Sequence, residues 1–163
     1  MKCSVLIPLL DSAALLPKLF SSLPANAEII FSDRGSTDAS HDLVQSFLKK
    51  GRGVRLLREP GLSVAEALNR AADAATGELL LFLAPHALPA KRWMEAFAKG
   101  DADVRVGETL SVLPAKATPH GRLLTRLYKG HSRRTAQASG HALPWGPAEN
   151  LAVKKECWKK IGH

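Results

Sequence analysis

Several features that would indicate a disulfide-stabilised, membrane-spanning or zinc-binding protein are missing from this sequence. Only two cysteines, Cys3 and Cys157, occur among the 163 residues, so they are expected to be separate thiols in a reducing compartment. No run approaches the roughly 18 consecutive apolar residues that a membrane helix needs. The Cys and His spacing of structural zinc sites, the P-loop and the Gly-x-Gly-x-x-Gly turn are absent. These absences lead us to expect a cytoplasmic protein, with peripheral attachment to a membrane left open.

The start of the chain resembles a signal peptide only superficially. Met1 and Lys2 precede an apolar run over residues 5–10, but Asp11 ends that run and no clear small-residue cleavage site follows. We therefore predict that residues 3–8 form a buried strand.

Aromatic and acidic residues are also few. Aromatics make up only 6% of the chain, which offers no platform for stacking bases, so nucleic-acid binding is not expected. There are 15 acidic and 23 basic residues, which give a net charge of +8. Such an excess fits either an anionic partner or a well-solvated surface. The positive side chains are densest late in the chain, at Lys129, His131, Arg133, Arg134, Lys154, Lys155, Lys159 and Lys160.

Short apolar runs alternate with helical periodicity along the chain. The runs predict strands at residues 3–8, 28–32, 54–57, 79–83, 103–106 and 151–153, with helices between most of them. A β-α-β order of this kind predicts an α/β fold with a mostly parallel sheet and helices on both faces. The run at 79–83 is the most apolar and is expected to be a central strand. We expect one domain over residues 1–163, with a nucleotide-binding half at 1–107 and a basic, irregular, acceptor-side segment at 108–163.

Polar residues ahead of the apolar periods predict where helices begin. Asp11 or Ser12 is placed to cap the first helix, and Thr37 or Asp38 the second. A capping box over residues 63–66 is expected to begin the third.

Binding sites in open α/β sheets lie beyond the carboxyl ends of the strands, which directs attention to residues 9–11, 33–38 and 84–89. Asp33 ends the second strand, where its carboxylate can accept an N–H from a planar base, and Gly35 permits a tight turn. The alternative is a capped strand-to-helix turn that binds no ligand.

Five segments in order, and not Asp33 alone, resemble the family 2 glycosyltransferases of the GT-A fold. The most specific is residues 33–38, which is similar to the family's Asp-Asp-Gly-Ser-Thr-Asp. The resemblance spans nearly the whole chain. The other segments are residues 5–8 with Asp11, residues 61–69, residues 77–83, and residues 150–155 followed by Ile161-Gly162.

The resemblance implies binding of a nucleotide sugar, often UDP-linked in such enzymes, and transfer of the sugar to an acceptor hydroxyl. Asp33 would accept the N–H of uracil, and the backbone at Pro8 and Leu9 would border the base. Asp11 stands where the family often has Asn, and would accept a hydrogen bond from the nucleotide. Asn69 matches a family Asn and would either order the loop backbone or contact the ligand.

The chain departs from the family pattern at the metal site. The family's Asp-x-Asp, which holds Mn²⁺ or Mg²⁺ on the diphosphate, falls on Ala84-Pro85-His86. Ala84 supplies no ligand, and His86 supplies one nitrogen, which suits Mn²⁺ better than Mg²⁺. His86 could instead donate a hydrogen bond to phosphate.

Two further departures concern charge and catalysis. Arg34 replaces the family's second acidic residue, where it would either pair with phosphate or point outward. The family's general base normally lies further along the chain, and Glu149 is the only late acidic candidate.

Three functions remain open after these departures. The first is a weakly active or metal-independent glycosyltransferase, completed by a partner chain or a homo-oligomer. The second is a non-catalytic GT-A domain that binds a nucleotide or acts as a scaffold. The third, ranked last, is a basic module that binds anionic polymers through residues 122–134.

Overall fold

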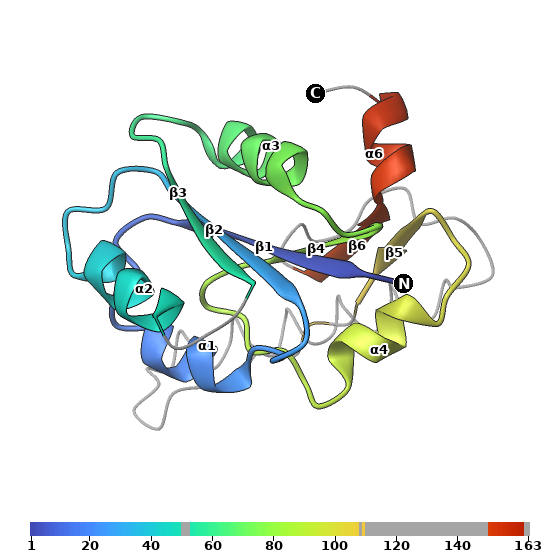
Figure 1. Ribbon diagram of the computed structural model, residues 1–163, viewed down its shortest axis with the longest axis horizontal. Coiled ribbons are helices and arrows are strands. Elements are labelled where there is room, and N and C mark those ends of the chain that lie inside the picture. Colours follow the sequence, from blue (N-terminus) through green and yellow to red (C-terminus); the bar gives the residue numbers. More distant parts are fainter. Residues whose placement is uncertain (50–52, 108, 110–149, 162–163) are drawn as a thin grey trace, which may run out of the picture.

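The computed structural model describes residues 1–49, 53–107, 109 and 150–161, which form six strands and five helices around one sheet (Figure 1). The basic stretch at 122–134 and Glu149 lie outside the described residues. In chain order the elements are β1 (Cys3–Leu9), α1 (Leu16–Ser22), β2 (Glu28–Asp33), α2 (Ser40–Leu48), β3 (Val54–Arg58), α3 (Val64–Ala74), β4 (Leu79–Leu83), α4 (Trp93–Ala98), β5 (Val104–Val106), β6 (Asn150–Lys154) and α6 (Lys155–Ile161).

The sheet has the strand order β3-β2-β1-β4-β6-β5. The first four strands in that order are parallel, and β6 runs antiparallel to both β4 and β5. The prediction of a mostly parallel α/β sheet is therefore confirmed. The strand at 79–83 is central and fully buried, as expected, although only its β1 side is paired in parallel.

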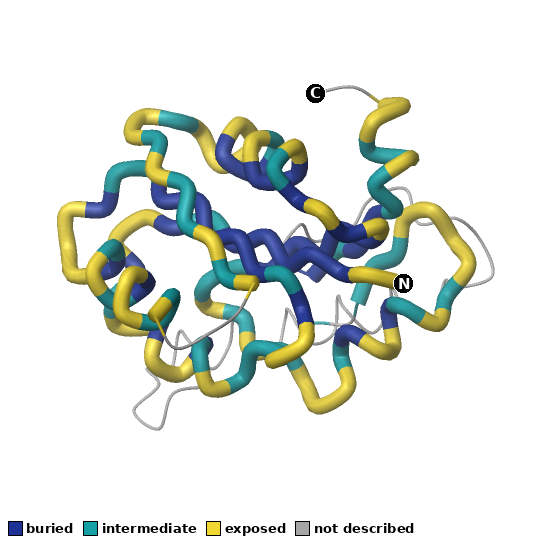
Figure 2. Tube along the Cα trace, in the orientation of Figure 1, coloured by how far each residue is buried: buried dark blue, intermediate teal, exposed yellow. Residues whose placement is uncertain are grey.

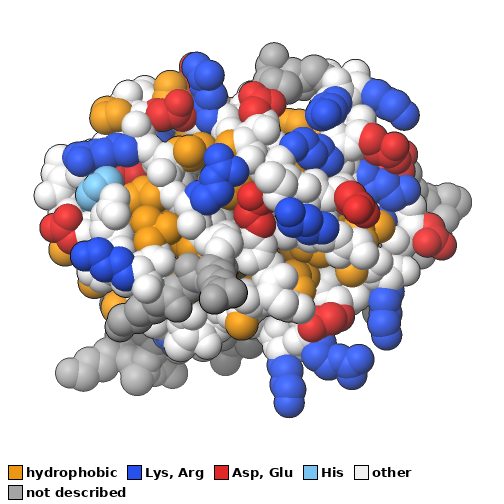
Figure 3. Space-filling model, viewed as in Figure 1, with side chains coloured by type: hydrophobic (Ala, Val, Ile, Leu, Met, Phe, Trp, Pro, Cys, Tyr) orange, Lys and Arg blue, Asp and Glu red, His pale blue; other side chains and the backbone are white. Residues whose placement is uncertain are grey.

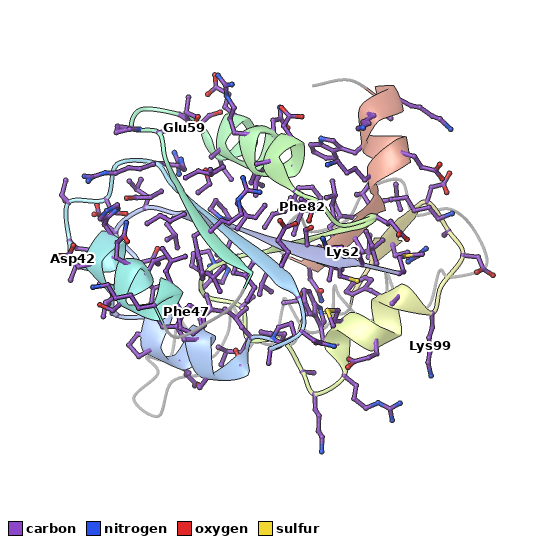
Figure 4. All side chains as sticks on the ribbon, viewed as in Figure 1. Lys2, Asp42, Phe47, Glu59, Phe82 and Lys99 are labelled. Atoms are coloured by element: carbon purple, nitrogen blue, oxygen red, sulfur yellow. The ribbon has the colours of Figure 1, made fainter. Side chains whose placement is uncertain are left out.

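Helices cover both faces of the sheet, with α1, α2 and α4 on one face and α3 and α6 on the other (Figure 1). Each face has its own apolar core, because side chains alternate across a strand. Phe47 belongs to the first layer, where it stacks on Phe20, and Phe82 belongs to the second, where it packs on Trp158 (Figure 4). Figure 2 shows that burial is concentrated in the strands between the two layers.

Helix capping agrees with the sequence for α3, agrees in part for α2 and differs for α1. Ser63 and Glu66 form the expected capping box of α3. Helix α1 begins only at Leu16, so the prediction that Asp11 or Ser12 caps it is wrong. Asp11 accepts hydrogen bonds from the turn after β2 instead, as described below, and the Ser12 hydroxyl donates to the carbonyl of Leu10, so neither side chain caps α1. Helix α2 follows Ala39, which makes no capping bond, but Oδ1 of Asp38 accepts from the N–H of Ser40, the first residue of the helix, at 2.9 Å. The prediction is therefore confirmed for the hydrogen bond of Asp38, whereas the hydroxyl of Thr37 donates to Asp11 instead.

Both cysteines are free thiols, as predicted, with Cys3 buried and Cys157 partly buried. Burial raises the pKa of the Cys3 thiol. No helix in the described part of the chain combines the length and apolar character needed to cross a membrane.

At the amino edge of the sheet, hydrogen bonds of Ser4 and Glu28 hold β1, β2 and the turn before β4 together. The hydroxyl of Ser4 donates to Glu28 and accepts from the backbone N–H of Gly77, while the N–H of Thr76 also donates to Glu28. Burial alone would raise the pKa of Glu28, but these hydrogen bonds hold it below its usual value. A Cβ on Gly77 would lie 2.5 Å from the Ser4 hydroxyl, so this position accepts only glycine without movement.

We predict that Gly77→Ala destabilises the fold by about 1–3 kcal/mol, because the added methyl must push β1 away from the turn before β4. Urea denaturation of the variant and the wild type measures the effect. Glu78→Ala, a change at an exposed neighbour, is the control and should stay within about 0.5 kcal/mol. An unchanged urea midpoint for Gly77→Ala would contradict the claim that the close contact between Gly77 and Ser4 requires glycine.

Candidate functional site

The loops that follow β1, β2, β3 and β4 meet at the carboxyl edge of the sheet, on the left of Figure 1. The backbone joins them directly: the N–H of Arg34 donates to the carbonyl of Leu9, and the N–H of Glu59 to that of Asp33. Parallel pairing places Leu9, Asp33 and Arg58 side by side at the ends of three neighbouring strands. This edge is where α/β sheets bind ligands.

Asp33 lies at this edge, as the sequence predicts, but its side chain is completely buried. Its Oδ1 accepts hydrogen bonds from the backbone N–H of Ser36 at 2.8 Å and of Gly35 at 3.3 Å. The expected tight turn is present, since Gly35 has φ of +101° and a Cβ there would meet Pro60 at 3.1 Å. One oxygen of the carboxylate therefore holds the turn together.

The other oxygen of Asp33 faces two residues that the sequence did not single out. Oδ2 lies 3.3 Å from Nδ1 of His41, in the first turn of α2, and 3.8 Å from Nε of Arg58. A carboxylate only accepts hydrogen bonds, so Nδ1 of His41 carries the hydrogen and donates. The pairing register of β2 and β3 was the signal that could have revealed Arg58, because neighbours in register share a face of the sheet.

Asp33 stays negatively charged in spite of its burial. Burial alone would raise the pKa of its carboxyl group. Hydrogen bonds from Ser36, Gly35 and His41 outweigh that effect and hold the pKa below its usual value. The edge thus presents a fixed carboxylate to any ligand that reaches it.

Asp11 ties the loop after β1 to the turn after β2. Its Oδ1 accepts from the N–H of Thr37 at 2.8 Å and of Asp38 at 3.3 Å, and the Thr37 hydroxyl also donates to it. In return, the N–H of Asp11 donates to the Ser36 hydroxyl and the N–H of Ala13 to Asp38. Asp11 has φ of +44°, a left-handed conformation that Asp and Asn tolerate better than most residues.

Of the other predicted nucleotide contacts, Pro8, Leu9 and Arg34 lie at or next to this edge, whereas Asn69 lies in the middle of α3. Pro8 is partly exposed and Leu9 is buried at the end of β1. Nε of Arg34 donates to the carbonyl of Leu62 at 2.8 Å, which anchors the loop before α3. Asn69 lies within α3 and lines a surface hollow of about 340 Å³ together with Glu66, Arg70 and Asp73.

The segment that would hold a metal follows β4. Ala84 and His86 form a turn closed by a bond from the N–H of Ala87 to the carbonyl of Ala84, and His86 is exposed. Beside it, Asn150 lies opposite Leu83 and accepts from the indole N–H of Trp93 at 2.8 Å. Within the described ranges, no three His, Cys, Asp or Glu side chains are close enough together to hold a metal ion. The donors present there do not fit a carboxylate-held Mn²⁺ or Mg²⁺.

The fold is that of the GT-A glycosyltransferases. The structure of the mannosyltransferase PcManGT from Pyrobaculum calidifontis, in complex with GDP-Man and Mn²⁺, superposes with a TM-score of 0.74 at 23% identity, over 99% of this chain and 46% of that one. Staphylococcus aureus TarS in complex with UDP-GlcNAc superposes with a TM-score of 0.61 at 21% identity, over 73% of this chain and 37% of that one.

The chain belongs to glycosyl transferase family 2, whose model matches residues 4–140. A PGL/p-HBAD biosynthesis glycosyltransferase of Mycobacterium bovis is 36% identical over 85 residues, which cover 49% of this chain and 33% of that protein. Validoxylamine A glucosyltransferase of Streptomyces hygroscopicus is 33% identical over 100 residues, which cover 57% of this chain and 22% of that protein. The matched regions thus span a third or less of these relatives.

We predict that Asp11→Ala destabilises the protein by about 1–2 kcal/mol, because three donors lose their acceptor and Ala disfavours positive φ. Asp11→Asn is the matched variant, since it keeps the acceptor and tolerates the backbone, and it should lose less than half as much. The free energy of unfolding in urea measures both. Equal losses for the two variants would contradict the view that the hydrogen bonds accepted by Asp11 hold the two loops together.

The lowered pKa of Asp33 predicts how acid affects stability. The Asp33 carboxylate makes its full contribution to the free energy of unfolding above the pH at which unfolded Asp titrates, about 3.9. This contribution is lost as the pH falls through the lower pKa of the folded state. Asp33→Asn lacks this titration, so it should be less stable than the wild type near neutral pH, and the gap should shrink in acid. Urea denaturation at about pH 6, 4.5 and 3 measures it. A gap that stays constant over this range would contradict the assignment.

Proposed function

We propose that this chain binds the nucleotide part of a UDP-linked sugar donor at the carboxyl edge of its sheet, as part of a family 2 glycosyltransferase. The proposal joins family membership to the geometry of the edge. Asp33 would accept the ring N–H of uracil, and the ends of β1 at Pro8 and Leu9 would border the base. Asp11 and Arg34 hold the surrounding loops in place.

The observation that carries the proposal is a charged carboxylate fixed at a strand end beside two parallel neighbours. Oδ1 is engaged by the turn, so the position of Oδ2 is set before any ligand arrives. Preorganised acceptors of this kind lose little entropy when they bind. Because Asp33 has no exposed surface, a base reaches Oδ2 only when His41 or Arg58, which are both partly exposed, makes room.

Transfer of the sugar would take place at the same edge, on a hydroxyl acceptor. The donors at Ala84 and His86 do not supply the carboxylate pair that holds a metal on the diphosphate in the family. His86 would instead donate a hydrogen bond to phosphate.

The second candidate function is a GT-A domain that binds a nucleotide without turning it over. The replacement of the acidic pair by Ala84 and His86, together with an intact turn at Asp33, favours it. Both candidates bind a nucleotide in the same way and differ only in turnover. Two free thiols are consistent with the reducing cytoplasm for either function.

We predict that UDP binds the chain and that methylation of uracil N3 weakens binding by about tenfold or more, because one hydrogen bond to a charged acceptor is lost. In Asp33→Asn the difference between UDP and N3-methyl-UDP should fall to within about threefold. Isothermal titration calorimetry measures all four affinities. A methylation effect that survives in Asp33→Asn would remove Asp33 from the base site.

Two controls accompany this experiment. Asp103→Asn removes one negative charge at the exposed start of β5, where Asp103 pairs with Lys154, and should leave the methylation effect unchanged. Titrations with Mn²⁺ and with EDTA examine the metal: similar UDP affinities would support the absence of a carboxylate-held ion. A sugar-transfer assay with UDP-sugars then separates the two candidate functions, because only the first predicts turnover.

A further inference from the structure

Asp33, His41 and Arg58 form one cluster of charged or ionisable side chains, and Arg58 is its most exposed member. Its side chain is 52% exposed, against 24% for His41 and 0% for Asp33. It ends β3, directly opposite Asp33 in the parallel register, so the two side chains share one face of the sheet. The Arg58 side chain therefore stands between the buried carboxylate and solvent.

The contact between Arg58 and Asp33 leaves most of the guanidinium group available. Nε lies 3.8 Å from Oδ2, which is within ion-pair range but too long for a direct hydrogen bond. A guanidinium group has five N–H donors in a planar fork. A ligand that reaches Oδ2 consequently meets an acceptor and, next to it, a set of donors that point in a common plane.

An acceptor beside a donor matches only some nucleobase edges. Uracil presents a ring N–H next to a carbonyl, and guanine presents the same pair at N1 and O6. Cytosine and adenine present an unprotonated ring nitrogen next to an amino group, which reverses the pattern and sets a lone pair against the carboxylate. Unpaired buried polar groups are costly, so a mismatched edge is rejected strongly.

We propose that Arg58 is a specificity-determining residue, whose guanidinium group binds the base carbonyl while Asp33 binds the adjacent ring N–H. The pair selects nucleotides whose base carries an N–H beside a carbonyl. This inference rests on the proposed function, since it assumes a nucleotide at the carboxyl edge.

The test compares UDP, GDP, CDP and ADP by calorimetry on the wild type and on Arg58→Ala. At least one of UDP and GDP should bind the wild type about tenfold more tightly than CDP and ADP, and whichever binds better identifies the base. In Arg58→Ala this difference in affinity between the preferred nucleotide and CDP or ADP should narrow to a gap of about threefold or less. Arg58→Met, which keeps length without donors, gives the same comparison should the alanine variant be unstable.

Arg55→Ala is the matched control, because Arg55 lies on the same strand and carries the same charge. It contacts Glu28 and the carbonyl of Ala74 at the opposite end of β3. It should weaken all four nucleotides by similar factors and keep the gap. A gap that persists in Arg58→Ala, or that narrows equally in Arg55→Ala, would overturn the inference while leaving the proposed function intact. A wild type that binds none of the four would overturn both.

Discussion

The buried negative charge of Asp33 is the constraint on which the carboxyl edge of this sheet depends. A carboxylate without exposed surface is stable only when hydrogen bonds replace its water, and here the turn at Gly35 and Ser36 supplies them. Because the same group ends β2 and begins the turn toward α2, the strand, the loop and the helix are held by a single side chain. Its second oxygen, which faces His41 and Arg58, then becomes the fixed point of the candidate site.

The order and type of the elements could be predicted from the sequence, because hydrophobic periodicity is a local property. The runs at 79–83 and 54–57 and the capping box at Ser63 and Glu66 all appear where expected. Side-chain partners across the edge could not be predicted in this way. Asp11 looked like a helix cap because helical periodicity follows it in the sequence, whereas the partners of its carboxylate, Thr37 and Asp38, lie 26 and 27 residues away.

In the candidate site, too, residues within a short motif could be predicted from the sequence, whereas residues that the fold brings together could not. Asp33 and Gly35 could be identified from a short motif, but His41 and Arg58 became visible only through pairing register and helix placement. Net charge was of little use, since Figure 3 shows Lys and Arg spread among Asp and Glu over the visible face instead of gathered in one patch. The chemistry of this edge therefore comes from a few fixed groups, while the overall positive charge of +8 acts only as a weak, long-range attraction for anions.

The position of β6 in the sheet has a consequence for how the chain is made. Strand β6 lies between β4 and β5, so β5 pairs with residues that follow it by more than 40 positions in the sequence. During synthesis, β1 to β4 emerge early and can pair at once, whereas β5 must wait until residues 150–154 leave the ribosome. The nascent protein is thus expected to assemble first the strands whose ends carry the candidate site, and to add the outer pair of strands as a separate, later step.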